Sequence, residues 1–318
     1  MPDPDPKAAP TGVPPDCVPT YRPADRYGFC ERVGARLRYA CWNAPGTARG
    51  SVVLLQGRAE FIEKYATEVV GELLARGLSV FAVDLRGQGL SDRPLPDHDK
   101  GHVDDFATYV ADLDAFLSAV VTPMAPRPIV ALSHSTSGNV VLRYLAERGS
   151  GPFGSAVFVS PMTALCRGGA IRALTTLLSP FGWRDGEYMV GTGSYDRQHR
   201  NFATNDVTRD ERRYRFTDAW FDADRRLRLG GPTVGWLRQA LRSIDRLATP
   251  GSLERIDLPV LLVSANGDRV VDATSHRSVA SRIRGCELVV VDGAQHEILM
   301  ETDPLRDRFW QAFDRFAQ

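Results

Sequence analysis

The sequence predicts an α/β protein with a mostly parallel central sheet and helices on both of its faces. Short, continuously apolar runs recur along the chain, which is typical of strands buried on both faces. Segments with apolar residues at helical spacing lie between these runs, and such alternation indicates parallel strands joined by helical crossovers. The length of 318 residues is enough for one large core or for a domain with an insertion.

The first half of the chain supplies most of the expected elements. The first two strands are hinged near Gly34, and Gly77 ends the first long helix. Asp104 and Asp105 lie near the positive end of the next helix, where acidic residues are stabilising. Strands are expected at 27–33, 36–42, 51–56, 79–84, 128–133 and 155–160, with helices at 61–76, 102–121 and 138–148.

The alternation breaks between residues 161 and 258 and then resumes. This stretch has glycine-rich turns, arginine clusters and aromatic residues but no convincing buried strand. Because it is too long for a loop, we interpret 161–258 as a helical cap, inserted between two late strands of a core formed by 26–160 and 259–318. The core then continues with strands at 259–264 and 286–291, a helix at 275–283 and a final helix from 304.

Residues 1–25 are expected to form a disordered tail, because residues 1–15 are rich in proline and aspartate. They also lack the apolar region of a secretory signal. The cysteines are scattered and form no C-x-x-C pair, which favours reduced thiols over a disulfide framework or a zinc site. We therefore expect a cytoplasmic protein. The five cysteines are Cys17, Cys30, Cys41, Cys166 and Cys286.

Composition argues against several classes of partner. The 39 Lys and Arg residues balance 39 Asp and Glu residues, so no net basic charge indicates nucleic-acid binding. No run approaches the roughly 18 apolar residues of a membrane span, so we expect at most peripheral membrane contact. No metal or organic cofactor is implied, and the sequence leaves the oligomeric state open.

A serine in segment 131–138 is placed as a nucleophile would be. The segment lies between a predicted buried strand and a helix, as does the tight turn that exposes a nucleophilic serine. Ser135 falls just after the strand, whereas Ser133 and Ser137 occupy flanking positions where glycine is usual. On composition alone any of the three could be the nucleophile, and a helix N-cap is the alternative interpretation. We favour Ser135.

An acid and a base follow two late strands. Asp268 comes after strand 259–264 and His296 after strand 286–291, so both lie at the carboxyl edge of the sheet, where α/β proteins place functional groups. Asp272 is the rival acid but suits a helix N-cap better. The order Ser135, Asp268, His296 is that of a hydrolase triad on this kind of sheet. The other histidines fit less well by position: His98, His102, His134, His199 and His276.

Five short motifs carry a family resemblance. They are QGRAE at 56–60, DLRGQGLS at 84–91, SHS at 133–135, NGD at 266–268 and GAQHE at 293–297. With them, the chain from about residue 36 onwards resembles α/β hydrolases of the lysophospholipase and monoacylglycerol-lipase-like group, the serine aminopeptidase or hydrolase-4 type. This resemblance implies the α/β-hydrolase fold.

The resemblance also implies an oxyanion hole formed by the main-chain N–H groups of Arg58 and Thr136, with no cofactor. The chain departs from the usual pattern at four positions. Family members usually have histidine at 56, often histidine at 88, and glycine at 133 and 137, where this chain has Gln56, Gln88, Ser133 and Ser137.

These observations predict a serine hydrolase that cleaves a carboxylic ester, of a lysophospholipid or monoacylglycerol, through an acyl-enzyme on Ser135. A peptidase, thioesterase or acyltransferase with the same triad, or a non-catalytic ligand-binding member of the fold, are alternatives, because a fold does not fix its substrate. In that group the cap forms an apolar channel, but we expect most apolar cap residues to form the core of the cap itself: Leu177, Leu178, Phe181, Trp183, Trp220, Phe221, Trp236 and Leu237.

Overall fold

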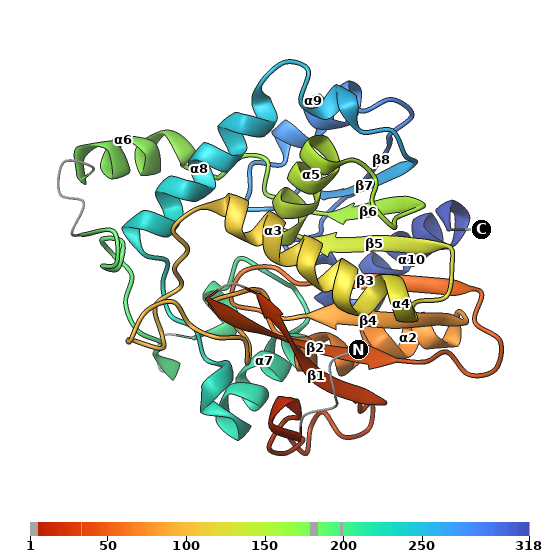
Figure 1. The fold of residues 1–318 in the computed structure, drawn as a ribbon. Coiled ribbons are helices and arrows are strands. Elements are labelled where there is room, and N and C mark those ends of the chain that lie inside the picture. The colour runs from red at the N-terminus through yellow and green to blue at the C-terminus, as the bar shows by residue number, and fades with distance from the viewer. Residues whose placement is uncertain (1–5, 33, 179–183, 198–199, 318) are drawn as a thin grey trace.

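The computed structural model describes residues 6–32, 34–178, 184–197 and 200–317. They form an eight-stranded sheet in the order β1-β2-β4-β3-β5-β6-β7-β8 (Figure 1). The pairs β1–β2 and β2–β4 are antiparallel, and all other neighbours are parallel. The strands are β1 (Arg26–Arg32), β2 (Ala35–Trp42), β3 (Gly50–Leu55), β4 (Leu78–Val83), β5 (Ile129–His134), β6 (Ser155–Val159), β7 (Val260–Ala265) and β8 (Glu287–Val291).

Helices cover both faces of the sheet, as the sequence predicts (Figure 1). Successive strand residues point to opposite faces, so Val53 and Leu55 join one apolar core while Val52 and Leu54 join the other. The first core includes residues of α3 (Phe106–Phe116), α5 (Thr136–Arg148) and α9 (Thr274–Arg282). The second includes residues of α1 (Ile62–Ala66), α2 (Val69–Ala75) and α10 (Asp303–Phe316).

Two expected helices differ in detail from the structure. The helix expected at 61–76 is divided into α1 and α2, because Glu68 has φ −140° and ψ −52°, outside the helical range. The helix expected at 102–121 begins only at Phe106, where the carboxylate of Asp105 accepts a hydrogen bond from the Ala107 N–H. It then continues as a π-helical turn, η2 (Leu117–Val121), into α4 (Thr122–Met124).

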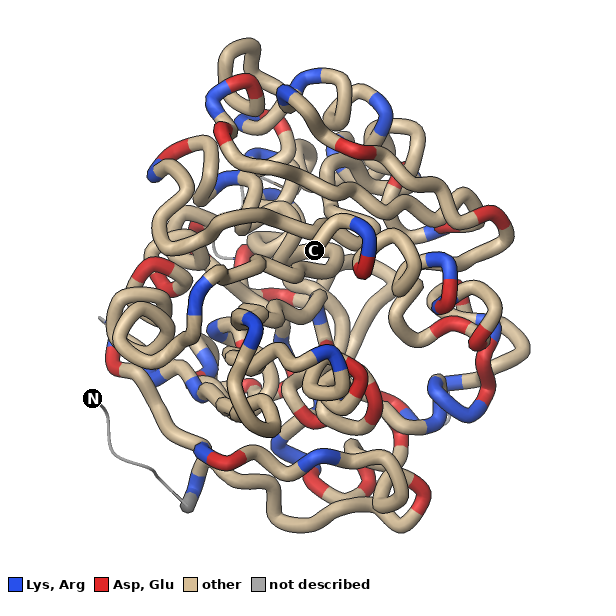
Figure 2. The backbone as a smooth tube through the Cα atoms, turned by 90° about the vertical axis from the view of Figure 1, so that its right-hand side faces the viewer, with Lys and Arg blue, Asp and Glu red and all other residues tan. Residues whose placement is uncertain are grey.

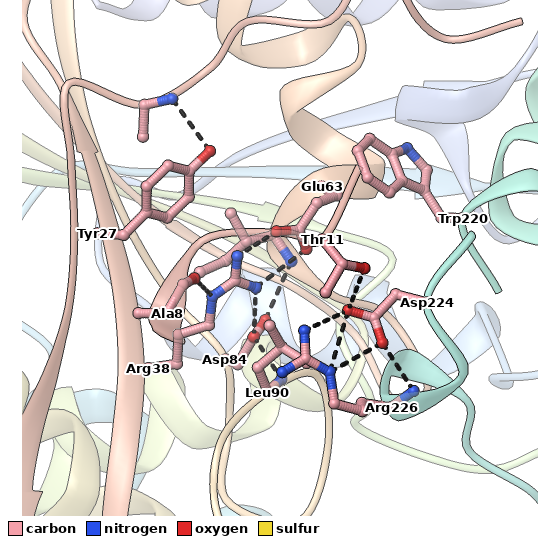
Figure 3. A network of polar contacts seen from close by, with 12 residues as sticks. Ala8, Thr11, Tyr27, Arg38, Glu63, Asp84, Leu90, Trp220, Asp224 and Arg226 are labelled. Atoms are coloured by element: carbon pink, nitrogen blue, oxygen red, sulfur yellow. Dashed lines mark hydrogen bonds and ion pairs between the residues drawn. The ribbon is translucent and has the colours of Figure 1, made fainter. Parts of the chain in front are cut away.

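The expectation of a disordered tail is wrong for residues 6–25. The Ala8 and Cys17 side chains are fully buried. The guanidinium of Arg38, buried in β2, donates from Nε to the Ala8 carbonyl at 2.7 Å and also pairs with Glu63 and Asp84 (Figure 3). A proline-rich composition argues against regular structure, but it does not prevent an irregular segment from packing when buried groups need its carbonyls.

The N-terminal segment also meets the inserted segment, residues 161–258. Thr11 donates to Asp224, which in turn pairs with Arg226 (Figure 3). Asp224 ends helix α7, so this contact joins the two segments on the side of the sheet that carries β1 and β2. The described part of the N-terminal segment thus contacts both β2 and the inserted segment.

The inserted segment lies between β6 and β7 in the chain, and in its described ranges three α-helices alternate with irregular stretches. Its helices are α6 (Gly168–Leu178), α7 (Glu211–Ala223) and α8 (Val234–Ala248). Trp220 and Phe221 of α7 are buried in the second core, whereas Leu177 of α6 is exposed. Phe181 and Trp183 lie outside the described residues. The short 3₁₀ turns are η1 (Pro6–Ala8), η5 (Phe202–Thr204), η6 (Arg225–Leu227), η7 (Leu253–Arg255) and η8 (Ile298–Met300).

Charged residues of both signs are interspersed over the face of the molecule that Figure 2 shows. This distribution agrees with the balanced composition of the chain. Within the described ranges, no helix is both long and apolar enough to cross a membrane.

Candidate active site

Ser135 lies on a sharp turn between β5 and α5. Its backbone has φ 52° and ψ −115°, a conformation that side-chain-bearing residues rarely adopt. Such strain at one residue is maintained only where the surrounding structure enforces it. Glycine is required nearby at 138, because a Cβ there would lie 2.7 Å from Cβ of Pro161. The turn therefore presents the Ser135 side chain at the carboxyl end of β5.

His296 and Asp268 meet Ser135 at this edge of the sheet. Nε2 of His296 lies 2.8 Å from Oγ of Ser135, and Nδ1 lies 2.6 Å from Oδ2 of Asp268. Asp268 follows β7 and His296 follows β8, as the sequence analysis expects. The Ser135 and His296 residues are buried, and the Asp268 side chain is fully enclosed.

The surroundings of Asp268 favour its ionised form. Burial alone would raise the pKa of this carboxyl group, but the hydrogen bond and charge of His296 lower it below its ordinary value. Oδ1 also accepts hydrogen bonds from the N–H groups of Val270 and Val271, at 2.8 and 3.0 Å. The rival Asp272 accepts from Thr274 at the start of α9, and in the described structure it is Asp268, not Asp272, that is hydrogen-bonded to His296.

Arg58 and Thr136 line the same pocket as Ser135. Arg58 follows β3 directly after Gly57, and Thr136 is the first residue of α5, next to the serine. The turn at Gly57 is fixed by a hydrogen bond from its N–H to the carboxylate of Glu60. The two residues that the family resemblance assigns to an oxyanion hole thus line one pocket with the serine and follow different strands.

The serines at 133 and 137 have different environments. The Ser137 hydroxyl donates to the carbonyl of Gln56, immediately before the Gly57 turn. The Ser133 hydroxyl is buried, and among the described residues it has no hydrogen-bond partner. Serine at 137 therefore links the turn that carries Ser135 to the turn that carries Arg58.

A buried polar network beside Ser135 was missed by the sequence analysis. The carboxylate of Glu60 accepts from Nζ of Lys64 at 2.7 Å, from the hydroxyl of Tyr65 at 2.9 Å and from Nδ1 of His134 at 2.9 Å. Lys64 also binds Glu297, the neighbour of His296, at 2.7 Å. Two signals in the sequence could have indicated this network. Glu60 and Lys64 are four residues apart, a spacing typical of ion pairs along a helix, and Glu297 is a charged residue next to His296.

In this network, Glu60, Lys64 and His134 each favour the charged form although they are buried. Desolvation would raise the pKa of Glu60, but Lys64 and His134 hold it well below its ordinary value. Desolvation would lower the pKa of His134, but Glu60 raises it above its ordinary value. Paired in this way, the buried charges offset each other's desolvation.

A cavity of about 290 Å³ adjoins Ser135 and His296. Most of its apolar lining comes from the inserted segment. Of the apolar residues named from the sequence, Trp236 and Leu237 line it, whereas Trp220 and Phe221 pack in the core. Elsewhere in the described chain, no group of three or more His, Cys, Asp or Glu is arranged to hold a metal ion. The inserted residues that line the cavity include Met162, Leu165, Ile171, Val207, Trp236 and Leu237.

The sheet is mostly parallel, and it presents a serine after β5, an aspartate after β7 and a histidine after β8. This arrangement defines an α/β hydrolase. The chain belongs to the family described as serine aminopeptidase, S33 (Hydrolase_4), which it matches over residues 46–303. The resemblance stated from the motifs is thereby confirmed.

Known proteins support the same family and fold. The chain is 34% identical over 270 residues to lysophospholipase L2 of Escherichia coli K12, covering 80% of this chain and 76% of the relative. It is 29% identical over 270 residues to a probable lysophospholipase L2 of Haemophilus influenzae, covering 84% and 83%. Its fold is similar to a monoglyceride lipase of Saccharomyces cerevisiae, with a TM-score of 0.71, 19% identity, and coverage of 91% and 94%.

Proposed function

We propose that this protein is a serine hydrolase that cleaves the carboxylic ester of a lysophospholipid or monoacylglycerol. The observation that carries the proposal is the continuous hydrogen-bonded chain from Ser135 through His296 to Asp268. In this chain, Nδ1–H of His296 donates to the Asp268 carboxylate, which leaves Nε2 free to accept the serine proton.

The reaction begins when Oγ of Ser135 attacks the ester carbonyl and its proton passes to Nε2 of His296. The Asp268 carboxylate stabilises the imidazolium that forms. The main-chain N–H groups of Arg58 and Thr136 hold the negatively charged carbonyl oxygen. The C–O bond then breaks, and the alcohol leaves with the proton from His296. Water, deprotonated by His296, attacks the acyl-enzyme and releases the carboxylic acid and Ser135.

The assignment of a lipid ester is supported by two observations. The cavity beside Ser135 has a largely apolar lining from the inserted segment, which suits an acyl chain. Two relatives carry the names lysophospholipase L2 and probable lysophospholipase L2, and a protein of similar fold is a monoglyceride lipase. Residues 161–258 act in this proposal as a cap that shapes the acyl site.

The proposal extends to location. A cytoplasmic protein that meets membranes at most peripherally is supported by the cysteines, each of which is a free thiol in the structure. It would act on lipid monomers or at the membrane surface without spanning it.

Hydrolysis of p-nitrophenyl esters, from acetyl to palmitoyl, tests the function. The parent protein is compared with Ser135→Ala, and a fluorophosphonate probe reports whether the serine is reactive. Turnover and labelling that both disappear in the variant support the proposal, and the preferred chain length gives the depth of the acyl site. Turnover that persists in the variant excludes Ser135 as the nucleophile. A parent that neither turns over esters nor reacts with the probe would be a ligand-binding protein instead.

A further inference from the structure

Among the residues that the structure describes, the side chain of Arg58 has no carboxylate partner, although it lines the cavity next to Ser135. Its Nη2 donates to the carbonyl of Gly230 at 2.7 Å, while its Nε is buried and has no hydrogen-bond partner among the described residues. No Arg58 ion pair occurs within the described ranges. Arg58 is also the only Arg or Lys among the described residues that line this cavity.

Two arginines that are more deeply buried than Arg58 are paired with acidic groups. Arg38 pairs with Glu63 and Asp84, and Arg213 pairs with Glu68 and Asp210. An uncompensated guanidinium away from bulk water is costly. Burial accordingly lowers the pKa of Arg58, to about 10. The guanidinium is therefore still charged at neutral pH, although its surroundings disfavour the charged form. An anion brought by a ligand would remove this cost.

The guanidinium is held in a defined position. Its Cζ lies 5.4 Å from the ring centroid of Trp236, a cation–π distance. Gly101 leaves room for it, because a Cβ there would lie 2.4 Å from Nη2. Together with the bond to Gly230, these contacts fix the charge at the wall of the cavity that Trp236 forms.

We infer that Arg58 binds the phosphate group of a lysophospholipid and thereby selects this substrate over a neutral monoacylglycerol. This inference rests on the proposed function. Only the glycerol backbone separates the phosphate of a lysophospholipid from its ester carbonyl. The main-chain N–H of Arg58 would hold the carbonyl oxygen while its side chain holds the phosphate. A guanidinium suits a phosphate because it can donate two parallel hydrogen bonds.

Binding of ether lipids, which cannot be hydrolysed, tests this inference apart from catalysis. A short-chain 1-O-alkyl-glycerol 3-phosphate and the matching 1-O-alkylglycerol are titrated by calorimetry, below the concentrations at which they form micelles. The parent protein is expected to prefer the phosphate by at least about tenfold. Arg58→Gln should reduce that preference by about 10- to 100-fold, the size of a hydrogen bond to a charged group.

Two further variants complete the design. Arg58→Lys keeps the charge but loses the planar fork, and should give an intermediate preference. It also serves as the test if Arg58→Gln does not fold. Arg284→Gln removes an equally positive, highly exposed side chain away from the cavity and should keep the parental preference.

The outcomes separate this inference from the proposed function. A parent without preference for the phosphate, or an Arg58→Gln protein with the parental preference, overturns the inference even if esters are hydrolysed. A parent that binds the phosphate through Arg58 but fails to hydrolyse the corresponding esters overturns the function and leaves an anion-selective lipid-binding site.

Discussion

Nε2 of His134 lies 3.3 Å from the main-chain carbonyl of His296, and the two imidazole rings have centroids 4.8 Å apart. His134 is in turn bound to Glu60, which accepts a hydrogen bond from the N–H of Gly57 in the turn before Arg58. The buried network therefore connects the loop of the proposed base with the turn of the proposed oxyanion hole. Through Lys64 it reaches the base loop a second time, at Glu297. Such supporting contacts fix reacting groups relative to one another.

Replacing Lys64 by methionine should destabilise the protein strongly at neutral pH. The change leaves the carboxylates of Glu60 and Glu297 without their shared cation, and breaking a buried pair costs about 3–5 kcal/mol. Glu60 has a lowered pKa in the parent, so its contribution is present above the ordinary carboxyl pKa and is lost as pH falls through the lowered value. The deficit of the variant should therefore narrow only below about pH 4, where the parent also loses the contribution of the ionised Glu60.

Urea unfolding at both pH values measures this effect. Arg172→Met is the matched control, because Arg172 pairs with Asp245 on the surface, with both side chains about half exposed. Such a pair contributes at most about 1 kcal/mol. Equal losses in the two variants would contradict a special role for the buried network.

Replacing Asp268 by asparagine should lower kcat by about 10⁴-fold with little change in stability. The lowered pKa of Asp268 keeps the carboxylate ionised through the neutral range, so the parent stabilises the imidazolium of His296 at any such pH. An asparagine amide cannot do this and favours the wrong imidazole tautomer. Steady-state kinetics on a p-nitrophenyl ester give the ratio.

Asp272→Asn is the control for this prediction. Asp272 accepts hydrogen bonds at the start of α9, and asparagine serves equally well there. Its kcat should stay within about twofold of the parent value. If Asp272→Asn loses as much activity as Asp268→Asn, the assignment of the acid is wrong.

The placement of the proposed triad was predictable because it depends on local signals. Ser135, Asp268 and His296 each follow a separate buried strand, and parallel strands bring their carboxyl ends to one edge. The positions of the apolar runs in the sequence were therefore enough to predict that these three side chains lie at the same edge of the sheet. The same reasoning could place Arg58 after β3, but it could not show that its side chain has no acidic partner among the residues described by the structure.

Features that depend on contacts between distant segments were not predictable. Composition indicated disorder for residues 1–25, yet Cys17 packs in the core and Arg38 uses the Ala8 carbonyl. Nothing local to Ala8 reveals that a buried guanidinium needs an acceptor there. The pairing of Lys64 with Glu297 is of the same kind, because more than two hundred residues separate its partners.

Removal of residues 1–10 should lower the free energy of unfolding by about 1–3 kcal/mol, because Nε of Arg38 loses its acceptor inside the protein. Thermal or urea unfolding of the shortened chain gives the value. Thr11→Val, which removes only a partly buried hydrogen bond to Asp224, should cost less than about 1 kcal/mol. A shortened protein as stable as the parent would show that the packing of this segment contributes nothing.

Alanine variants of Ser133 and Ser137 test what these two serines, which stand where glycine is usual, contribute to stability and activity. Ser137→Ala removes the donor to the Gln56 carbonyl and leaves that buried acceptor unsatisfied, so the free energy of unfolding should fall by about 1–3 kcal/mol. Because Gln56 precedes the Gly57 turn, kcat should fall as well. Ser133→Ala removes a hydroxyl that is buried without a partner, so it should be neutral or stabilising and should leave kcat unchanged.

The two alanine variants differ from the parent by the same single atom, so the comparison isolates the hydrogen bond from the change in volume. Urea unfolding and ester hydrolysis on both proteins measure it. Adding Ser137→Gly separates the hydroxyl from the Cβ, since only the hydroxyl contacts Gln56. If Ser137→Gly is as active and as stable as the parent, serine at this position is a tolerated replacement and not a link between the Ser135 turn and the Arg58 turn.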